Sequence, residues 1–423
     1  MPKTLREQLK NDPENEEFVV SVKEHFFRSV HPRSKRLIEK QIAADVELQK
    51  KIEKVTAAAP TTLIWKEKQE PVEAFVLNRG EYDQKGEKVV RATPQSLPAF
   101  NETFSNDRLG LANWLVSPEH PLTSRVAVNR YWQQFFGIGL VATADDFGSQ
   151  GELPSHPELL DWLSVEFREN GWDVKALVKK IVMSSTYRQS SHASPEKLRV
   201  DSANRFFCRG PRFRLDAETL RDQALSVAGI LVPTIGGPTV KPPQPDGLWF
   251  AVGYSRSNTV RFKKDQGHEK VHRRSLYTFW KRSSPPPQMS TLDAPTRESC
   301  IVRRERTNTP LQALLMMNDP QYVEAARYFA QLAMDAQLKS DEEVVEFMYS
   351  RAMANPISAQ RLKIMLVDLA ANTAEFEKDP ESAKLLISIG ENPPDSKYDP
   401  VRLASLTMLA NLILNLDEFI TKN

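Results

Sequence analysis

The chain has 423 residues, of which 40% are hydrophobic, so it can bury a sizeable core and is long enough for two or three domains. Its 57 Lys and Arg side chains nearly balance its 55 Asp and Glu side chains, and the net charge of +2 excludes a global field that would attract nucleic acid or an anionic membrane. Any affinity for anions must therefore be local.

The first sixty residues have a helical pattern. Apolar side chains recur at helical spacing over residues 16–30 and 34–55. The opening residues are charged and lack the apolar stretch of a signal peptide, and no run of about 20 apolar residues follows anywhere in the sequence. The sequence predicts a helical segment over residues 1–60, with no export signal and no membrane span.

Beyond this segment the apolar pattern becomes alternating. The alternating segments are residues 61–68, 73–80 and 87–93. Alternation with intervening turn residues predicts a small antiparallel β insert near residues 61–91. Prolines then interrupt the pattern, so residues 61–99 are predicted to form a small β segment and linker.

From about residue 100 onward helical patterns dominate. They cover residues 106–116, 122–137, 156–170, 173–187, 216–231, 341–353, 358–376, 380–390 and 400–420. A capping residue followed by proline, the usual start of a helix, occurs at Thr309–Pro310 and at Asp319–Pro320. We therefore predict a mainly α protein, in which residues 100–423 form a helical body that follows the small β insert.

The two cysteines, Cys208 and Cys300, are too few for a disulfide framework. No paired Cys/His spacing typical of zinc sites and no CxxCH motif occurs, so the chain is predicted to hold neither a metal nor a covalently attached haem c. An oxidising compartment would allow one Cys208–Cys300 disulfide. A reducing one would leave two buried thiols.

Arginines gather before two predicted helices and within a third. They are Arg209, Arg212 and Arg214 before the helix that follows Asp216, Arg303, Arg304 and Arg306 before the helix at Pro310, and Arg125 and Arg130 within residues 122–137. A helix N-terminus already carries partial positive charge, so arginines there need a negative partner. One interpretation is an internal ion-pair network with Asp145, Asp146, Asp161, Asp216, Asp222 and Asp293. The other is a cleft that binds a sulfate, phosphate or carboxylate group of a ligand.

Two histidines next to prolines, His120 and His156, enclose the acidic pair Asp145 and Asp146 in the sequence. If the intervening loop folds back, these four residues are candidates for a mixed metal site or an acid/base pair. The alternative is structural, with His156 simply starting a helix at Pro157.

Trp249 follows the proline-rich stretch of residues 232–247, which is predicted to be an extended surface loop. We expect an exposed indole there, which makes Trp249 a candidate for stacking on a sugar ring. No glycine-rich phosphate loop, GxSxG or HExxH motif is present, so no familiar catalytic class is indicated.

Several phrases combine into a resemblance. They are "HPLTSRVAVNRYWQQFFGIGLVATADDFGSQGELPSHPELLDWL", "PRFRLDAETLRDQAL", "RRSLYTFWKRSSPPP", "RRERTNTPLQALLMMNDPQYVEAAR" and "NLDEFI". Together, over roughly residues 71–420, they resemble the planctomycete-specific domain found at the C-terminal end of large proteins with cytochrome-c-like domains upstream. That family has no established biochemical activity.

The resemblance implies an extracytoplasmic setting, in the periplasm or at the cell surface, with residues 1–60 as the tail of an upstream module. It also implies that haem c belongs to upstream modules of relatives. Under this interpretation the chain is an accessory module that binds anionic or sulfated polysaccharide, or a redox partner, through its arginines. A polysaccharide-active enzyme and a purely structural cell-surface module are the alternatives.

Overall fold

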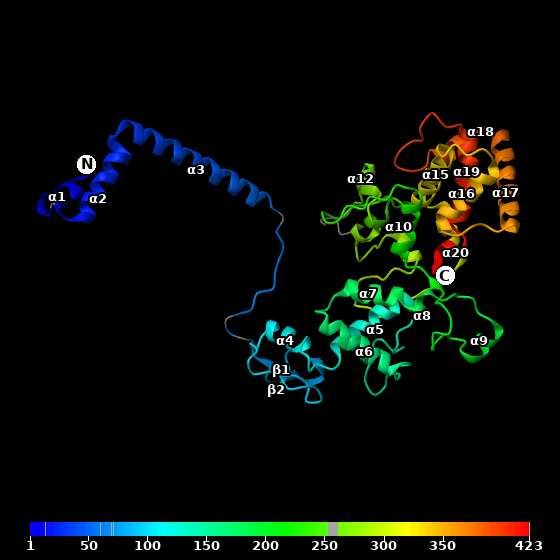
Figure 1. Cartoon of the computed structure of the whole chain (residues 1–423), viewed down its shortest axis with the longest axis horizontal. Coiled ribbons are helices and arrows are strands. Elements are labelled where there is room, and N and C mark those ends of the chain that lie inside the picture. The colour runs from blue at the N-terminus through cyan, green and yellow to red at the C-terminus, as the bar shows by residue number, and fades with distance from the viewer. Residues whose placement is uncertain (13, 60, 69, 71, 253–260, 423) are drawn as a thin grey trace. The chain divides into compact units, whose positions relative to one another are not determined.

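The computed structural model describes residues 1–12, 14–59, 61–68, 70, 72–252 and 261–422. The chain divides into two compact units, Met1–Arg91 and Ala92–Asn423, which are described in turn. Helices account for most of the described chain, and two small antiparallel sheets of two strands each supply its paired strands (Figure 1). The predicted mainly α fold is confirmed. The finer division into residues 1–60, 61–99 and 100–423 stays a prediction.

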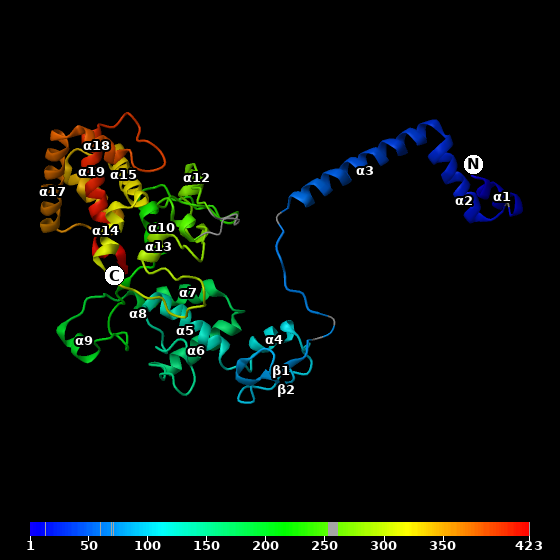
Figure 2. The same cartoon turned by 180° about the vertical axis from the view of Figure 1, so that it is seen from behind.

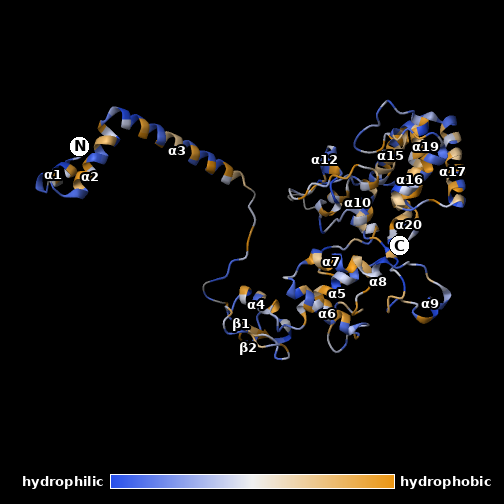
Figure 3. Cartoon of the chain, viewed as in Figure 1, coloured by the Kyte–Doolittle hydropathy of each residue, from blue (hydrophilic) through white to orange (hydrophobic). Residues whose placement is uncertain are grey.

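The first unit begins with helices that are defined by local signals. They are α1 (Lys3–Asn11), α2 (Glu16–His25), a π-helical turn (Phe26–Val30) and α3 (Pro32–Ala58). The side chain of Asn15 accepts hydrogen bonds from the first turn of α2, and His31 caps α3 with Pro32 at its first position. Blue and orange residues alternate along α3 in Figure 3, and apolar residues of this helix such as Ile42 and Val46 are exposed.

The β insert of the first unit is a single hairpin. Strand β1 (Ala74–Leu77) pairs antiparallel with β2 (Lys85–Val89), and Asn78–Gly80 forms a short 3-10 turn after β1. The predicted insert is therefore confirmed, but the prediction of a strand at residues 61–68 is wrong. Residues 61–68 form no strand and have no neighbouring strand among the described residues. Their backbone N–H and C=O groups therefore form no sheet hydrogen bonds with a described strand.

In the first part of the second unit, α5 packs against α6 and α7. The helices of this part are α4 (Arg108–Leu115), α5 (Thr123–Phe136), α6 (Pro157–Glu169), α7 (Val174–Met183), α8 (Ser185–Arg188) and α9 (Pro195–Val200). Trp132 stacks on Phe136 with ring centroids 4.2 Å apart, and Phe207 packs edge-on against both rings. The buried amide of Asn129 exchanges hydrogen bonds of 2.9 and 3.0 Å with the backbone of Val141. This aromatic core and amide clamp fix α5 and the loop that follows it.

The rest of the second unit forms a larger helical core. Its elements are β3 (Phe213–Arg214), α10 (Ala217–Val227), α11 (Leu248–Val252), α12 (His268–Val271), a 3-10 turn (Ser275–Tyr277), α13 (Pro287–Thr291), α14 (Pro310–Asn318), α15 (Pro320–Asp335), α16 (Asp341–Met353), α17 (Ala359–Lys378), α18 (Pro380–Ile387), α19 (Pro400–Leu414), α20 (Asp417–Ile420) and β4 (Thr421–Lys422). Figures 1 and 2 show α15 and α19 side by side when viewed from opposite directions.

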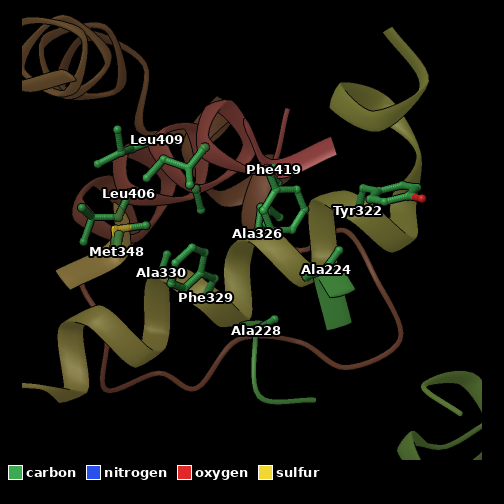
Figure 4. Packing of buried hydrophobic residues seen from close by; sticks show 14 of the residues in the cluster. Ala224, Ala228, Tyr322, Ala326, Phe329, Ala330, Met348, Leu406, Leu409 and Phe419 are labelled. Carbon is green, nitrogen blue, oxygen red and sulfur yellow. The ribbon is translucent and has the colours of Figure 1, made fainter. Parts of the chain in front are cut away.

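Small residues allow α15 and α19 to pack closely. Ala326 and Ala330 of α15 and Ala404 and Ala410 of α19 have no exposed surface. Figure 4 shows Ala326 and Ala330 with larger side chains of the same core, including Phe329 and Leu406. Because α19 is apolar on nearly all sides, it is a buried core helix. No helix among the described residues combines the length and apolar character needed to span a bilayer.

The predicted helix starts at Thr309–Pro310 and Asp319–Pro320 are confirmed. Thr309 and Gln312 form a capping box at the start of α14, and Asp319 caps α15 through the N–H of Gln321. Asp216 stands at the N-cap position of α10, but its side chain makes no capping hydrogen bond. Its carboxylate instead faces arginines that precede α14.

Candidate functional site

A pocket of about 190 Å³ lies between α5 and the segment that leads into α14. It is lined by Gln133, Gln134, Pro295, Ile301, Val302, Arg303, Arg304 and Arg306. We call this site the arginine pocket. Of the described residues that line it, three are arginines and none is acidic. A liquid-phase water occupies about 30 Å³, so the pocket has room for a ligand fragment rather than one ordered water.

Arg304 is held in place by a carboxylate outside the pocket lining. Its Nη1 and Nη2 atoms lie 2.5 and 3.2 Å from the two carboxylate oxygens of Glu218, in the first turn of α10. Its Nε is 3.9 Å from Asp216. Burial alone would lower the pKa of Arg304, but its bonds to Glu218 and the charge of Asp216 raise that pKa above its usual value. Arg304 therefore supplies a fixed and permanently charged guanidinium group to the pocket lining.

Arg306 is less completely paired. Its Nη2 lies 3.7 Å from an Asp216 oxygen, and its guanidinium stacks 4.1 Å from the ring centroid of Phe213. Its Nε is buried and has no hydrogen-bond partner among the described residues. Burial lowers the pKa of Arg306, Asp216 opposes that effect, and the neighbouring charges of Arg304 and Arg303 lower the pKa further. The like charges at this wall thus destabilise one another.

Arg303 completes the positive side of the pocket. It is exposed, and no ion pair or hydrogen bond joins its side chain to the described part of the chain. Arg297, Arg304 and Arg306, by contrast, share the carboxylates of Asp216 and Glu218. The positive charge of Arg303 is consequently not compensated by a described ion-pair partner.

The opposite wall carries two amides from the last turns of α5. Gln134 is exposed, whereas Gln133 is only 7% exposed. The side chain of Gln133 forms no hydrogen bond with any residue that the structure describes, although its backbone carbonyl accepts the N–H of Gly137. The wall is thus polar, uncharged and capable of both donating and accepting hydrogen bonds.

Arg214 of β3 and Arg212, which precedes this strand, lie outside the pocket lining. Arg212 forms an ion pair with Asp417. Arg214 donates from Nη1 to the side chain of Asn308 at 2.9 Å, while its Nε and Nη2 are buried without described partners. Burial lowers the pKa of Arg214, and Asp293, Tyr322 and Asp417 act against that effect. These two arginines connect β3 to its neighbours and are not brought to the pocket.

Arg125 and Arg130 also lie apart from the pocket lining. The Nε of Arg125 is 2.7 Å from an Asp161 oxygen, and its Nη1 donates to the carbonyl of Pro121 at 2.6 Å. Arg125 therefore ties α5 to α6. Arg130 is exposed on α5 and forms no ion pair with a described residue.

The two predicted histidines have structural surroundings. His120 is buried, with its ring edge-on to Trp114 at 4.5 Å, and its Nδ1 is 3.3 Å from the backbone nitrogen of Thr123 at the start of α5. Burial lowers the pKa of His120. His156 precedes α6, where its Nδ1 lies 3.0 Å from Ser155 Oγ and its ring contacts Phe207. His120 thus accepts a hydrogen bond at the start of α5, whereas His156 precedes α6 without capping it.

The aspartates do not complete a metal site with these histidines. Asp145 is exposed, and Asp146 accepts a hydrogen bond from the backbone of Gly148 at 2.7 Å. Within the described ranges, no group of three or more His, Cys, Asp or Glu side chains is arranged to hold a metal ion. The interpretation of these four residues as a mixed metal site is therefore wrong for the described structure.

The expected exposure of Trp249 is wrong. Only 2% of its surface is accessible, because Phe262 and Phe279 pack against its ring at 5.2 and 5.5 Å. The ammonium group of Lys281 lies 4.9 Å from the indole centroid. The loop chemistry indicated an irregular segment but could not indicate that distant aromatics enclose the indole, which leaves no face for a sugar ring.

The expected burial of both thiols is also wrong. Cys208 is half-buried and Cys300 is exposed, and neither forms a disulfide. The irregular segment that carries Cys300 has no core-facing periodicity that would enclose the thiol.

Sequence reasoning missed two components of the site. Glu218 had a readable signal, since an acidic residue in the first turn of a helix is favoured there and can attract arginines. Gln133 had no such signal, because a glutamine within an amphipathic helix is ordinary. A separate buried group was also missed. His272 and Arg327 both lie beside the carboxylate of Glu324, at 3.2 and 3.5 Å.

The sequence of the chain was compared with known protein families, curated proteins and solved structures. No curated protein and no solved structure matches the chain. The family model described as PSD1, protein of unknown function (DUF1553), matches residues 107–367, more than half of the chain, and this range includes every residue that lines the arginine pocket. The chain therefore belongs to the PSD1 family of proteins of unknown function.

Proposed function

We propose that this chain is a binding module that takes up the anionic group of a glycan, a sulfate ester or a uronic acid carboxylate, in the arginine pocket. The observation that carries the proposal is Arg303, a pocket-lining arginine without a described ion-pair partner. An oxyanion placed beside Arg303 would compensate its charge. It would also reduce the repulsion between Arg303 and Arg306.

The pocket favours a planar or tetrahedral oxyanion on chemical grounds. Guanidinium groups bind carboxylates and sulfates through paired hydrogen bonds, and Arg304 is already oriented by Glu218. A volume of about 190 Å³ suits a single substituent of a sugar better than the broad surface of a protein redox partner. These properties support glycan binding over the redox-partner alternative.

The biological setting of the proposal rests on the family resemblance. We place the module outside the cytoplasm, in the periplasm or at the cell surface, as an accessory to a polysaccharide-utilisation protein whose upstream modules carry haem c. In this role the chain itself needs no cofactor. Its task is to hold an anionic polysaccharide near the other modules.

Calorimetric titration with sulfated, uronic-acid and neutral oligosaccharides tests the proposal. We expect binding of at least one anionic class and no binding of the neutral class, with affinity that falls between about 20 mM and about 500 mM salt. Arg303→Ala should weaken binding about five- to tenfold. The matched control is Arg199→Ala, which removes an exposed arginine of α9 outside the pocket. Equal losses in both variants, or binding that is insensitive to salt, would refute the proposal.

A further inference from the structure

We propose that Gln133 is the specificity-determining residue of the arginine pocket, and that it reads a hydroxyl group next to the anion of the ligand. This inference rests on the proposed anion-binding function and adds to it. The ligand class becomes an oxyanion carried on a polyhydroxyl framework, as opposed to any small anion.

The first observation is the burial of Gln133 without a described partner. Gln133 is only 7% exposed and lines the pocket, and its side chain makes no hydrogen bond within the described part of the chain. Most largely buried polar side chains have a hydrogen-bond partner. The amide atoms of Gln133 are not among the fully buried atoms without a partner, so they retain access to the space that the residue lines. An amide in this condition at a pocket wall is therefore available to a ligand.

The second observation concerns hydrogen-bond chemistry. Arg303, Arg304 and Arg306 can only donate, so they recognise an oxyanion but cannot accept the proton of a hydroxyl group. The amide of Gln133 has an oxygen that accepts and a nitrogen that donates. A ligand that has an anion and a neighbouring hydroxyl group would satisfy both walls of the pocket at once.

The third observation is that one aromatic ring, that of Phe213, contacts both the end of α5 and an arginine of the opposite pocket wall. Gly137 ends α5 with φ of 78°, and a Cβ atom at this position would lie 2.8 Å from the ring of Phe213. The same ring lies 4.1 Å from the guanidinium of Arg306. Phe213 therefore packs against the end of the helix that carries Gln133 and also against an arginine of the opposite wall. A site of this kind can select ligands by the spacing between the anion and the hydroxyl group.

Two matched ligand pairs test the inference. Glucose 6-sulfate is compared with methyl sulfate, and glucuronate with acetate, because the members of each pair share a charged group and differ in the hydroxylated sugar ring. In a pair that binds, wild type should prefer the sugar about five- to tenfold, the value expected for one or two added hydrogen bonds. Gln133→Met keeps the side-chain length and should reduce the affinity for the sugar to that for the simple anion, while the latter changes less than about twofold.

The variants separate specificity from structure. Gln133→Met should leave the Tm nearly unchanged, because the amide that it removes has no described hydrogen-bond partner and the side-chain length is kept. The control Gln331→Met makes the same change at a glutamine that is 8% exposed and lies on α15, and it should not alter ligand preference. Equal binding of both members by wild type, or an equal loss of both in Gln133→Met, overturns the role of Gln133 but leaves the anion site standing. If no ligand of either pair binds, the proposed function fails and this inference falls with it.

Discussion

Arg304 and Glu218 form a two-point ion pair that joins the segment before α14 to the first turn of α10, with N–O distances of 2.5 and 3.2 Å. This ion pair explains in part why several arginines can lie just before the N-terminus of α14. The carboxylate of Glu218 is favourable at the N-terminus of α10, and it also compensates Arg304. The arginines of the cluster differ in how they are paired. Arg304 is paired internally, and the adjacent Arg303 has no described partner.

Replacing Glu218 should separate stability from ligand binding. Glu218→Gln removes the negative partner of the half-buried Arg304, so the free energy of unfolding should fall by about 1–2 kcal/mol, as measured by urea denaturation. The same change makes the pocket more positive, and anion affinity should rise about threefold. Glu305→Gln, at an exposed neighbouring position, is the control and should change stability by less than about 0.5 kcal/mol. Loss of stability together with loss of anion binding would mean that Glu218 acts mainly by orienting the pocket residues, and that its effect on the charge of the pocket is smaller.

Gly137 should matter to the pocket as well as to the helix end. Gly137→Ala places a methyl group in the left-handed region and within 2.8 Å of the Phe213 ring, so it should destabilise the fold by about 1–3 kcal/mol and weaken ligand binding by displacing Phe213. Gly171→Ala is a close control, because Gly171 has φ of 66° but no neighbouring atom within 4 Å. It should show only the strain and leave binding intact. Identical binding in the two variants would argue against Phe213 as the link between the walls.

Trp249 should contribute to folding and not to ligand binding. Trp249→Ala removes an indole that is 2% exposed and packed against Phe262 and Phe279. The expected loss in the free energy of unfolding is about 3–5 kcal/mol, which chemical denaturation can measure. At a temperature where the variant is folded, its glycan affinity should equal that of wild type. A selective loss of glycan affinity with normal stability would restore Trp249 as a ligand contact.

Acid should destabilise the second unit through its buried and half-buried histidines. The Nδ1 atoms of His268 and His272 are 2.8 Å apart, which leaves room for one proton between them, and the Nε2 of His272 lies 3.2 Å from Glu324. Burial first, and then the charge of His272, lower the pKa of His268, while Glu269 and Glu324 oppose this effect. The unfolded chain therefore binds more protons than the folded chain, and stability should fall as the pH drops below about 6.5.

The buried carboxylate adds a second acid transition at lower pH. Burial would raise the pKa of Glu324, but the bond and charge of His272 and the backbone N–H groups of Glu391 and Asn392 hold it below its usual value. The ionised carboxylate of Glu324 therefore stabilises the folded chain at a pH above the pKa that this group has in the unfolded chain. This stabilisation is lost as the pH falls through the lower pKa that Glu324 has in the folded chain. Urea denaturation between pH 8 and 3, taken in steps of about one unit, should resolve both losses. His268→Gln should reduce the first loss without abolishing it, since His120 has a lowered pKa too, and His192→Gln, at an exposed position, should not. A profile of His268→Gln identical to that of wild type would contradict the assignment.

Local signals in the sequence were sufficient for much of the fold. Thr309–Pro310 and Asp319–Pro320 marked the starts of α14 and α15, because the capping side chain and the proline are neighbours in the chain. The strand predicted at residues 61–68 failed since alternation describes a face but cannot supply a partner strand. The candidate site depended on contacts across long separations. Arg304 meets Glu218 86 residues away, and nothing local to Trp249 indicated its enclosure by Phe279.

Crystals soaked with selenate, a sulfate analogue whose selenium scatters anomalously, give the most direct test of the arginine pocket as an anion site. We predict an anomalous peak within hydrogen-bond distance of Arg303 and Arg306, which is absent from crystals of Arg303→Ala and retained in those of Arg199→Ala. A pocket without selenium, in crystals where selenate is bound only at other arginines, would contradict the central claim. The cluster before α14 would then serve the internal ion-pair network alone.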